Sequence, residues 1–407
     1  MASEVRAGHG GRRQSPLEWR DAKESFLAPG KGCGLTAHTV VVGGGVSGLS
    51  AALALLRRGR RVTVLERGRA GGESSWAGGG ILAPLLPWDY SEAVNALALR
   101  SMAAYADWVA EIEAASGLSA EFWRCGMLAL AVPLPQQALA WCAAHGMAAE
   151  REAPTGLSSL SPSLPLLGGG GNSIWLPDVA QARNPRLVAA LRAAVEKLGG
   201  TVREHCEAVG VETRGGRVAG VRTPAEVFAA DSVVLATGAW AGLGIAGLTA
   251  APQIRPIRGQ MLLFKLEPGA LGTILYRNGL YLIPRRDGHV LVGSTLEDAG
   301  FDKTTDAATC QRLHDEAASL LPDLAGLEPI RHWAGLRPGS PDNIPVIDRH
   351  PDFDNVFVNV GHYRYGVTMA PASAELLADL IEGKAPALDP APYRWQAALE
   401  RRWTDGS

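Results

Sequence analysis

A glycine-rich turn carries the first recognisable chemistry in the chain. Gly43, Gly45 and Gly48 stand in the spacing G-x-G-x-x-G, between the apolar residues 40–42 and a run of alanines and leucines. The first glycine permits a tight turn, the second lets the backbone approach a diphosphate, and the third lets the following helix lie close to the sheet. Glu66 ends the next apolar run, where its carboxylate can accept hydrogen bonds from both hydroxyls of a ribose. The pattern predicts an ADP-binding βαβ unit and leaves open whether the ligand is FAD or a nicotinamide dinucleotide.

A second glycine turn lies near the other end of the chain. Residues 361–366 follow an apolar run at 356–360 and precede a predicted helix at 369–382. The N–H groups of such a turn and the dipole of the helix can stabilise an anionic or electron-rich group. In a flavin this group is the pyrimidine side of the isoalloxazine ring, whereas without a ligand the turn is simply a strand-to-helix connection.

The elements around these turns indicate two kinds of sheet. The run at 232–238 lacks polar alternation, which predicts a strand buried on both faces of a parallel sheet. Between 255 and 292 several short alternating strands are bounded by Gly, Pro and Asp, which indicates antiparallel pairing. Helices are predicted at 91–117, 135–145 and 184–198. The sequence therefore predicts an α/β fold (α+β overall), in which a Rossmann-like dinucleotide-binding domain is interleaved with an antiparallel-sheet substrate domain.

The composition is that of an ordinary globular protein with a small-molecule ligand. The 407 residues are 47% hydrophobic and 20% charged, which is enough chain for two domains with sizeable cores. A formal net charge of -2 without a basic face argues against nucleic acid as a partner, and no apolar run is long enough to span a membrane. The five cysteines are odd in number and lack C-x-x-C spacing, so we expect reduced thiols, no metal site and a cytoplasmic location.

Several further motifs point to one family. The chain resembles the D-amino acid oxidase family of flavoproteins, and most closely the glycine oxidases of thiamine thiazole synthesis, in register from about residue 38 to 385. The motifs that carry the resemblance are VVGGGVSGLSAALAL with LERG, SSWAGGGILAP, RNPRLVAAL at 183–191, VVLATGAW at 233–240, IRPIRGQML at 254–262, GLYLIPR at 279–285, WAGLRPGSPDNIPVI at 333–347 and GHYRYGVTMAPASAELLADLI at 361–381.

The resemblance implies non-covalent FAD as the cofactor. Covalently flavinylated members of the family carry a cysteine just before the segment that reads HWAGLRP here, and no cysteine stands at that point. The implied cofactor-binding residues are Gly43, Gly45, Val46, Ser47, Gly48, Glu66 and Arg67 at the ADP part, Val209 at the adenine, Ser75, Ala77, Gly80 and Leu82 along the flavin, Gly238 and Trp240 closing the cleft, and His362, Tyr363, Arg364, Tyr365, Gly366 and Val367 at the pyrimidine ring.

The order of the predicted elements divides the chain into discontinuous domains, and the Gly, Arg, Ser and Pro of residues 1–37 indicate an extension outside the fold. The expected ranges are 38–95, 180–250 and 330–385 for the FAD-binding domain, 96–179 and 251–329 for the substrate domain, 1–37 for a disordered N-terminal extension and 386–407 for a C-terminal tail.

Three side chains are implied at the substrate. Arg337 is the expected partner of an amino-acid carboxylate, because a guanidinium group offers two parallel donors; the alternative is a surface arginine or a structural salt bridge. Tyr281 adds its hydroxyl to the carboxylate, unless it is only a half-buried strand aromatic. Arg364 positions the carboxylate or the flavin, unless it only caps the preceding strand. Tyr365 departs from the small amide that is usual in the family's turn, which weakens the expectation of a preference for the smallest amino acid.

The implied activity is the FAD-dependent oxidative deamination of glycine and of other small amines or D-amino acids. A hydride passes from the α-carbon to flavin N5 without a side-chain base, and the products are an imine or glyoxylate, ammonia and hydrogen peroxide. The implied partners are the amino acid, dioxygen, further copies of the chain in a homo-oligomer, and the machinery of thiamine thiazole synthesis. The alternatives left open are a D-amino acid, sarcosine or proline oxidase and a quinone-linked dehydrogenase. The second glycine turn disfavours a nicotinamide dehydrogenase, and a flavin-binding protein without turnover is the remote alternative.

Overall fold

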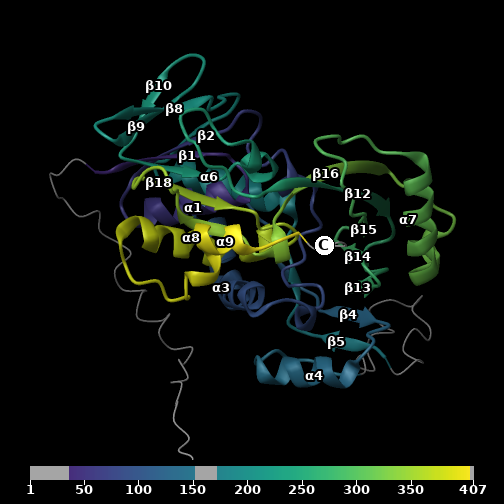
Figure 1. Cartoon of the computed structure of the whole chain (residues 1–407). Coiled ribbons are helices and arrows are strands. Elements are labelled where there is room, and N and C mark those ends of the chain that lie inside the picture. Colours follow the sequence, from purple (N-terminus) through teal and green to yellow (C-terminus); the bar gives the residue numbers. More distant parts are fainter. Residues whose placement is uncertain (1–35, 152–171, 404–407) are drawn as a thin grey trace, which may run out of the picture. The chain divides into compact units, whose positions relative to one another are not determined.

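The computed structural model describes residues 36–151 and 172–403 of the chain (Figure 1). Nearly all of the expected extension at 1–37 and the cysteine at position 33 lie outside the described residues. In the described part, a mainly parallel sheet of six strands and a mainly antiparallel sheet of seven strands carry the fold. This architecture confirms the predicted fold class.

The six-stranded sheet is built from the valine-rich runs of the sequence. Its order is β17-β18-β11-β1-β2-β7, and every pair is parallel except the edge pair of β17 and β18. The central strands are buried almost throughout, as is typical of a parallel sheet covered on both faces. The strands are β1 His38–Val42, β2 Arg61–Leu65, β7 Thr201–Arg203, β11 Ser232–Leu235, β17 Val346–Arg349 and β18 Val356–Val360.

Four long helices pack together beside this sheet. Helix α1 contacts α6 and α8, and α3 contacts the same two helices, while a small three-stranded sheet contacts β1 and β11. The predicted helices at 91–117 and 184–198 are confirmed, and α8 begins earlier than predicted because the second glycine turn runs directly into it. The bounds are α1 Val46–Arg57, α3 Glu92–Ser116, α6 Asn184–Lys197 and α8 Gly366–Glu382, with β8 Gly210–Arg214, β9 Arg217–Arg222 and β10 Val227–Ala229 in the small sheet.

The seven-stranded sheet has the order β16-β12-β15-β14-β13-β4-β5. All of its pairs are antiparallel except β13 with β4, and helix α7 Ala307–Leu320 packs against β12, β14 and β15. The strands are β4 Met127–Leu130, β5 Ile174–Leu176, β12 Arg255–Lys265, β13 Ile274–Arg277, β14 Leu280–Pro284, β15 His289–Gly293 and β16 Arg331–Gly339.

The remaining elements are short and lie between or beside the two sheets. The predicted range 330–385 contributes β16 to the seven-stranded sheet and β17 and β18 to the six-stranded one, and the predicted tail contains α9, which packs on β17. The domain boundaries themselves stay predictions. These elements are α2 Ser74–Ala77, β3 Trp123–Arg124, α4 Pro135–Ala144, β6 Ala180–Gln181 and α9 Trp395–Glu400.

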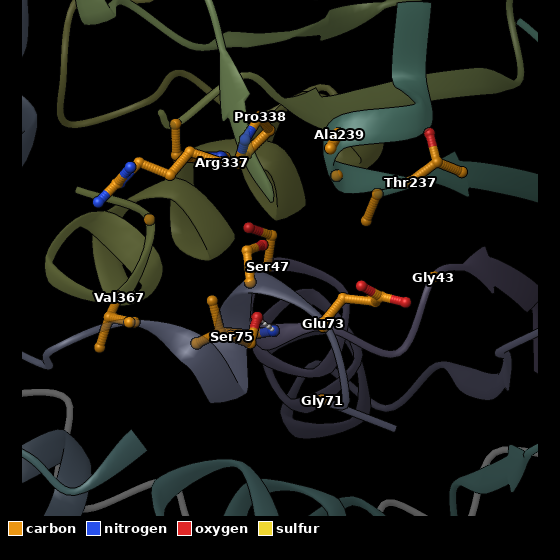
Figure 2. A pocket seen from close by; sticks show the side chains of 18 of the residues that line it. Gly43, Ser47, Gly71, Glu73, Ser75, Thr237, Ala239, Arg337, Pro338 and Val367 are labelled. Atoms are coloured by element: carbon orange, nitrogen blue, oxygen red, sulfur yellow. Dashed lines mark hydrogen bonds between the residues drawn. The ribbon is translucent and has the colours of Figure 1, made fainter. Parts of the chain in front are cut away.

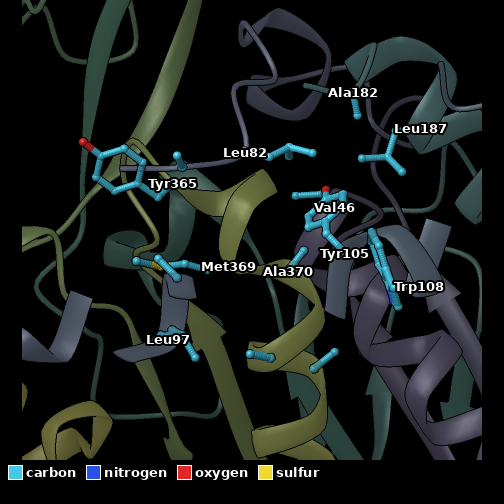
Figure 3. Packing of buried hydrophobic residues seen from close by; sticks show 14 of the residues in the cluster. Val46, Leu82, Leu97, Tyr105, Trp108, Ala182, Leu187, Tyr365, Met369 and Ala370 are labelled. Carbon is cyan, nitrogen blue, oxygen red and sulfur yellow. The ribbon is translucent and has the colours of Figure 1, made fainter. Parts of the chain in front are cut away.

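The largest hydrophobic core lies where the helices meet the cofactor-side loops (Figure 3). Leu97, Tyr105 and Trp108 of α3 pack with Met369 of α8 and with Leu82 of the glycine- and serine-rich loop. The Tyr105 hydroxyl donates a 3.0 Å hydrogen bond to the Val367 carbonyl, at the start of α8. The core therefore holds the second glycine turn in place. Among the described residues, no helix has both the length and the apolar character needed to cross a bilayer.

Candidate active site

One pocket brings both glycine turns together with the predicted substrate residues (Figure 2). In this view Thr237, Ala239, Arg337 and Pro338 lie along one side, and Gly71, Glu73, Ser75 and Val367 lie along the other. The predicted site residues that line it are Gly43, Gly45, Val46, Ser47, Glu66, Arg67, Ser75, Gly80, Gly238, Trp240, Tyr281, Arg337, His362, Tyr363, Arg364, Tyr365, Gly366 and Val367.

The first glycine turn leaves no room for side chains. Gly43 has a φ of 108°, and a Cβ atom there would lie 2.3 Å from the Ala236 carbonyl oxygen. A Cβ atom on Gly48 would lie 1.9 Å from the Gly43 carbonyl oxygen, so α1 packs directly on the turn. Helix α1 starts at Val46, whose N–H donates a 2.9 Å hydrogen bond to the Ser75 hydroxyl, and its N-cap residue Gly45 has no side chain to cap the N–H groups that follow. Its N-terminal N–H groups and its dipole therefore point toward the pocket, where a diphosphate would meet them.

Glu66 is held by backbone donors at the end of β2. Its Oε2 accepts a 2.8 Å hydrogen bond from the Gly44 N–H, and its Oε1 accepts one of 2.8 Å from the Gly68 N–H. Each carboxylate oxygen keeps a further lone pair. The group is thus fixed in orientation and still able to accept two hydroxyl donors.

Aromatic and charged side chains stack on one wall of the pocket. The Arg67 guanidinium lies 3.7 Å from the centroid of the Trp240 ring, and that ring stacks on Phe301 with a centroid distance of 5.4 Å. Lys303 reaches Glu73 at 3.1 Å. The loop after β15 is therefore anchored to the cofactor side of the pocket.

Two buried polar side chains in the pocket lining have atoms without protein partners. His362 receives a 3.0 Å contact between its Nε2 and the Ser373 Oγ, but its Nδ1 has no hydrogen-bond partner among the described residues. Burial lowers the pKa of His362 to about 4, so its ring is neutral at pH 7. Neither the Oδ1 nor the Nδ2 of Asn184 has a partner in the described structure. Buried polar atoms normally find partners, so these atoms fit a ligand with donors and acceptors along its edge, as a flavin ring has.

Arg337 is held in place but carries an unpaired charge. It projects from β16, where its Nη1 donates a 3.1 Å hydrogen bond to the Thr295 carbonyl and its Nη2 donates to the Ser294 hydroxyl. The guanidinium passes over Gly259, whose Cβ would lie only 2.0 Å from Nη1. No carboxylate pairs with Arg337 among the described residues. A salt bridge, which was the structural alternative for this residue, is thus not observed there.

Arg364 is a second guanidinium without a carboxylate partner in the described part of the chain. It lies in the turn before α8, and its Nη1 contacts the Tyr90 hydroxyl at 3.4 Å. Tyr365 lies next to it in the main core, where its ring meets Tyr90 edge-on at 5.1 Å and its hydroxyl accepts the Leu85 N–H at 3.4 Å. Two cations therefore face one pocket, which suits an anionic ligand.

Tyr281 completes the substrate end of the pocket. Its hydroxyl donates only a weak 3.4 Å contact to the Met261 sulfur, and its ring packs against the backbone at Gly79 and Gly293. The hydroxyl is therefore free to exchange this contact for a stronger acceptor such as a carboxylate.

Four predicted cofactor residues do not line the pocket. Gly48 supports the first turn, Ala77 packs against Gly335, and Leu82 is buried in the main core. Val209 is 37% exposed, and its N–H donates to the Arg222 carbonyl at 2.8 Å. Their roles toward the cofactor stay predictions, as do those of the other predicted site residues.

The pocket also contains residues that the sequence did not single out. Ser294 follows β15 and reaches Arg337 only because β12 pairs with both β15 and β16. Asn184 stands in a motif that was recognised without a role. The acids in the lining are Glu66, Glu73 and Glu207, all on cofactor-side segments, and the described residues contain no cluster of acids, histidines and cysteines suited to a metal.

Comparison with known proteins adds a consistent result. A family model described as FAD-dependent oxidoreductase (DAO) matches residues 38–380. A glycine oxidase of Pseudomonas putida is 44% identical over 370 residues, which cover 90% of this chain and 100% of the relative. A bifunctional ThiO/ThiG protein of Nostoc sp. is 33% identical and matches 85% of this chain but 53% of its own length. Among solved structures, the glycine oxidase from Geobacillus kaustophilus has a TM-score of 0.80 at 28% identity, covering 88% of this chain and 99% of that one.

Proposed function

The chain belongs to the DAO family of FAD-dependent oxidoreductases, and we propose that it is a glycine oxidase. The observation that carries this proposal is the pair of guanidinium groups without a carboxylate partner, Arg337 and Arg364, which face the same pocket as the start of α1. A small anionic substrate and a dinucleotide cofactor can therefore occupy one cavity.

The side chains have distinct tasks toward glycine. Arg337 binds the carboxylate through its two terminal nitrogens, and Tyr281 donates its hydroxyl to the same group. When bound, FAD accepts a hydride equivalent from the α-carbon of the amino acid, and dioxygen reoxidises it to give hydrogen peroxide. No carboxylate from a substrate-side segment lines the described pocket, so the residues bind and orient the amino acid rather than remove a proton from carbon.

Further features of the enzyme belong to the same proposal. The identity to a bifunctional ThiO/ThiG protein supports a link to thiamine thiazole synthesis, in which the imine or glyoxylate is consumed. We also propose a cytoplasmic enzyme that forms a homo-oligomer, with glycine preferred over sarcosine, proline and larger D-amino acids.

The test is anaerobic bleaching of the flavin absorption band by glycine, sarcosine, D-alanine and D-proline, followed by air and a peroxide assay. We expect glycine to bleach the band fastest and air to restore it with peroxide. Bleaching without reoxidation by air would make the protein a dehydrogenase with another acceptor. Faster bleaching by another amine would identify that amine, and not glycine, as the preferred substrate. No bleaching by any of the four compounds would overturn the proposal.

A further inference from the structure

A buried cation lies directly behind one wall of the pocket. Arg285, at the end of β14, is 5% exposed. Its Nη2 donates a 2.8 Å hydrogen bond to the Gly79 carbonyl, and its Nη1 donates to the Ala182 carbonyl at 3.2 Å and to the Gln181 side-chain oxygen. Its Nε has no partner among the described residues. All observed acceptors are thus neutral oxygens.

Arg285 has no direct ion-pair partner among the described residues. The closest acids, Glu121 and Asp287, both bind Arg183, at 3.1 and 2.8 Å. No carboxylate within the described residues forms an ion pair with Arg285 itself. A buried charge without a counterion is costly, so its retention requires a compensating interaction. Burial lowers the pKa of Arg285 to about 10, which still leaves the group protonated at pH 7.

The acceptor Gly79 belongs to the wall that faces the cofactor. Gly79 and Gly80 line the pocket, and the Gly80 carbonyl accepts the Ala182 N–H at 3.0 Å. A Cβ atom on Gly79 would lie 2.5 Å from Ile283 and 3.3 Å from Tyr281. Tyr281 and Ile283 of β14 and Arg285 directly after the strand occupy alternating positions, so one segment carries the substrate tyrosine, supports the glycine loop and anchors its carbonyl.

We propose that Arg285 is a positioning residue that fixes the Gly79 wall, and that its positive charge, which no direct ion pair neutralises in the described structure, favours the reduced form of the bound cofactor. Reduction adds negative charge to a flavin, and a fixed cation one peptide group behind the wall stabilises that charge in a water-poor environment. The inference rests on the FAD-binding part of the proposed function and does not depend on glycine as the substrate.

The test measures a redox equilibrium and needs no amine. FAD-loaded wild type, Arg285→Met and Arg285→Lys are each equilibrated with a reference dye under slow anaerobic reduction. For Arg285→Met we expect the ratio of reduced to oxidised flavin, at a fixed dye ratio, to fall about tenfold, which is roughly 30 mV for a two-electron couple. Arg285→Lys should keep most of the wild-type ratio because it keeps the charge. Arg286→Met is the matched control, since this neighbouring arginine is exposed.

An unchanged ratio in Arg285→Met, or an equal fall in Arg285→Met and Arg285→Lys, would overturn the role of the charge. If Arg285→Met does not retain FAD, Arg285→Gln takes its place, because it is neutral and keeps a donor for the Gly79 carbonyl. Loss of FAD from both neutral variants would reduce Arg285 to a purely structural residue. A fall in the ratio while glycine still fails to bleach wild type would support this inference and overturn the proposed substrate alone.

Discussion

The two ends of the pocket differ in whether backbone or side-chain groups line them. The cofactor end consists mainly of backbone: the turn at Gly43, the start of α1 and a glutamate held by two N–H groups. The substrate end consists of side chains, chiefly Arg337, which is held by the loop after β15.

This difference separates the two binding functions. The diphosphate and ribose part of the cofactor end lies within one βαβ unit, whereas the substrate end depends on the register of β12 with β15 and β16. Substitutions that alter the backbone of the turn should therefore weaken FAD binding, and substitutions that remove or displace guanidinium groups should weaken substrate binding.

The largest effect is expected for Gly48→Ala. The added Cβ would lie 1.9 Å from the Gly43 carbonyl oxygen, so helix and turn must move apart. We expect FAD affinity to fall by about 3 kcal/mol, or roughly 150-fold, as measured by titrating FAD into the FAD-free protein. Gly326→Ala is the control because a Cβ atom there meets nothing within 4 Å, and an equal loss in both variants would contradict the assignment.

Arg337→Met should affect the other end of the pocket. Removing the charged partner of a carboxylate costs about 2.5 kcal/mol, so we expect the KM for glycine to rise roughly 70-fold in a peroxide assay. Arg331→Met on the same strand removes an exposed arginine and should leave the KM unchanged. A KM within twofold of wild type for Arg337→Met would remove this arginine from the substrate site.

Gly259→Ala tests whether the position of Arg337 matters as well as its presence. A Cβ atom at residue 259 would lie 2.0 Å from the Arg337 Nη1 and would displace the guanidinium. The expected cost is about 1.5 kcal/mol, so the KM should rise roughly tenfold. FAD affinity measured in parallel should stay at the wild-type value. A larger change in FAD binding than in glycine binding would show that Gly259→Ala does not act by displacing the Arg337 guanidinium.

The smallest effect is expected from the pH dependence of His362. Its pKa is lowered from 6.5 to about 4 in the folded protein, so the unfolded chain takes up the proton first. The stabilisation is therefore complete above pH 6.5 and is lost as the pH falls toward 4, with about 0.8 kcal/mol lost between pH 8 and pH 6. In His362→Gln, the difference in unfolding free energy between these two pH values should shrink by that amount in denaturant titrations. An unchanged difference would show that His362 is not protonated more readily on unfolding.

The cofactor end was largely predictable from the sequence, because a turn, a helix start and a strand end follow one another along the chain. The fold class and the long helices were predictable for the same reason, since each has its own hydrophobic pattern. Ser294 and Arg285 were not singled out, because their partners Arg337 and Gly79 come from distant segments that only sheet pairing brings together. The sequence marked Tyr365 only as a departure from the usual small amide, whereas its ring packs in the core against Tyr90, a contact that no local pattern encodes.

The separation of the two ends is tested most directly by measuring the dissociation constants of FAD and of glycine in the same two variants, Gly48→Ala and Arg337→Met. The dissociation constant of glycine is taken from the dependence of the anaerobic bleaching rate on glycine concentration in protein saturated with FAD. We predict that Gly48→Ala weakens mainly the binding of FAD and that Arg337→Met weakens only the binding of glycine. Loss of FAD from Arg337→Met to the same extent as glycine would contradict the separation and show that the two ends act as one unit.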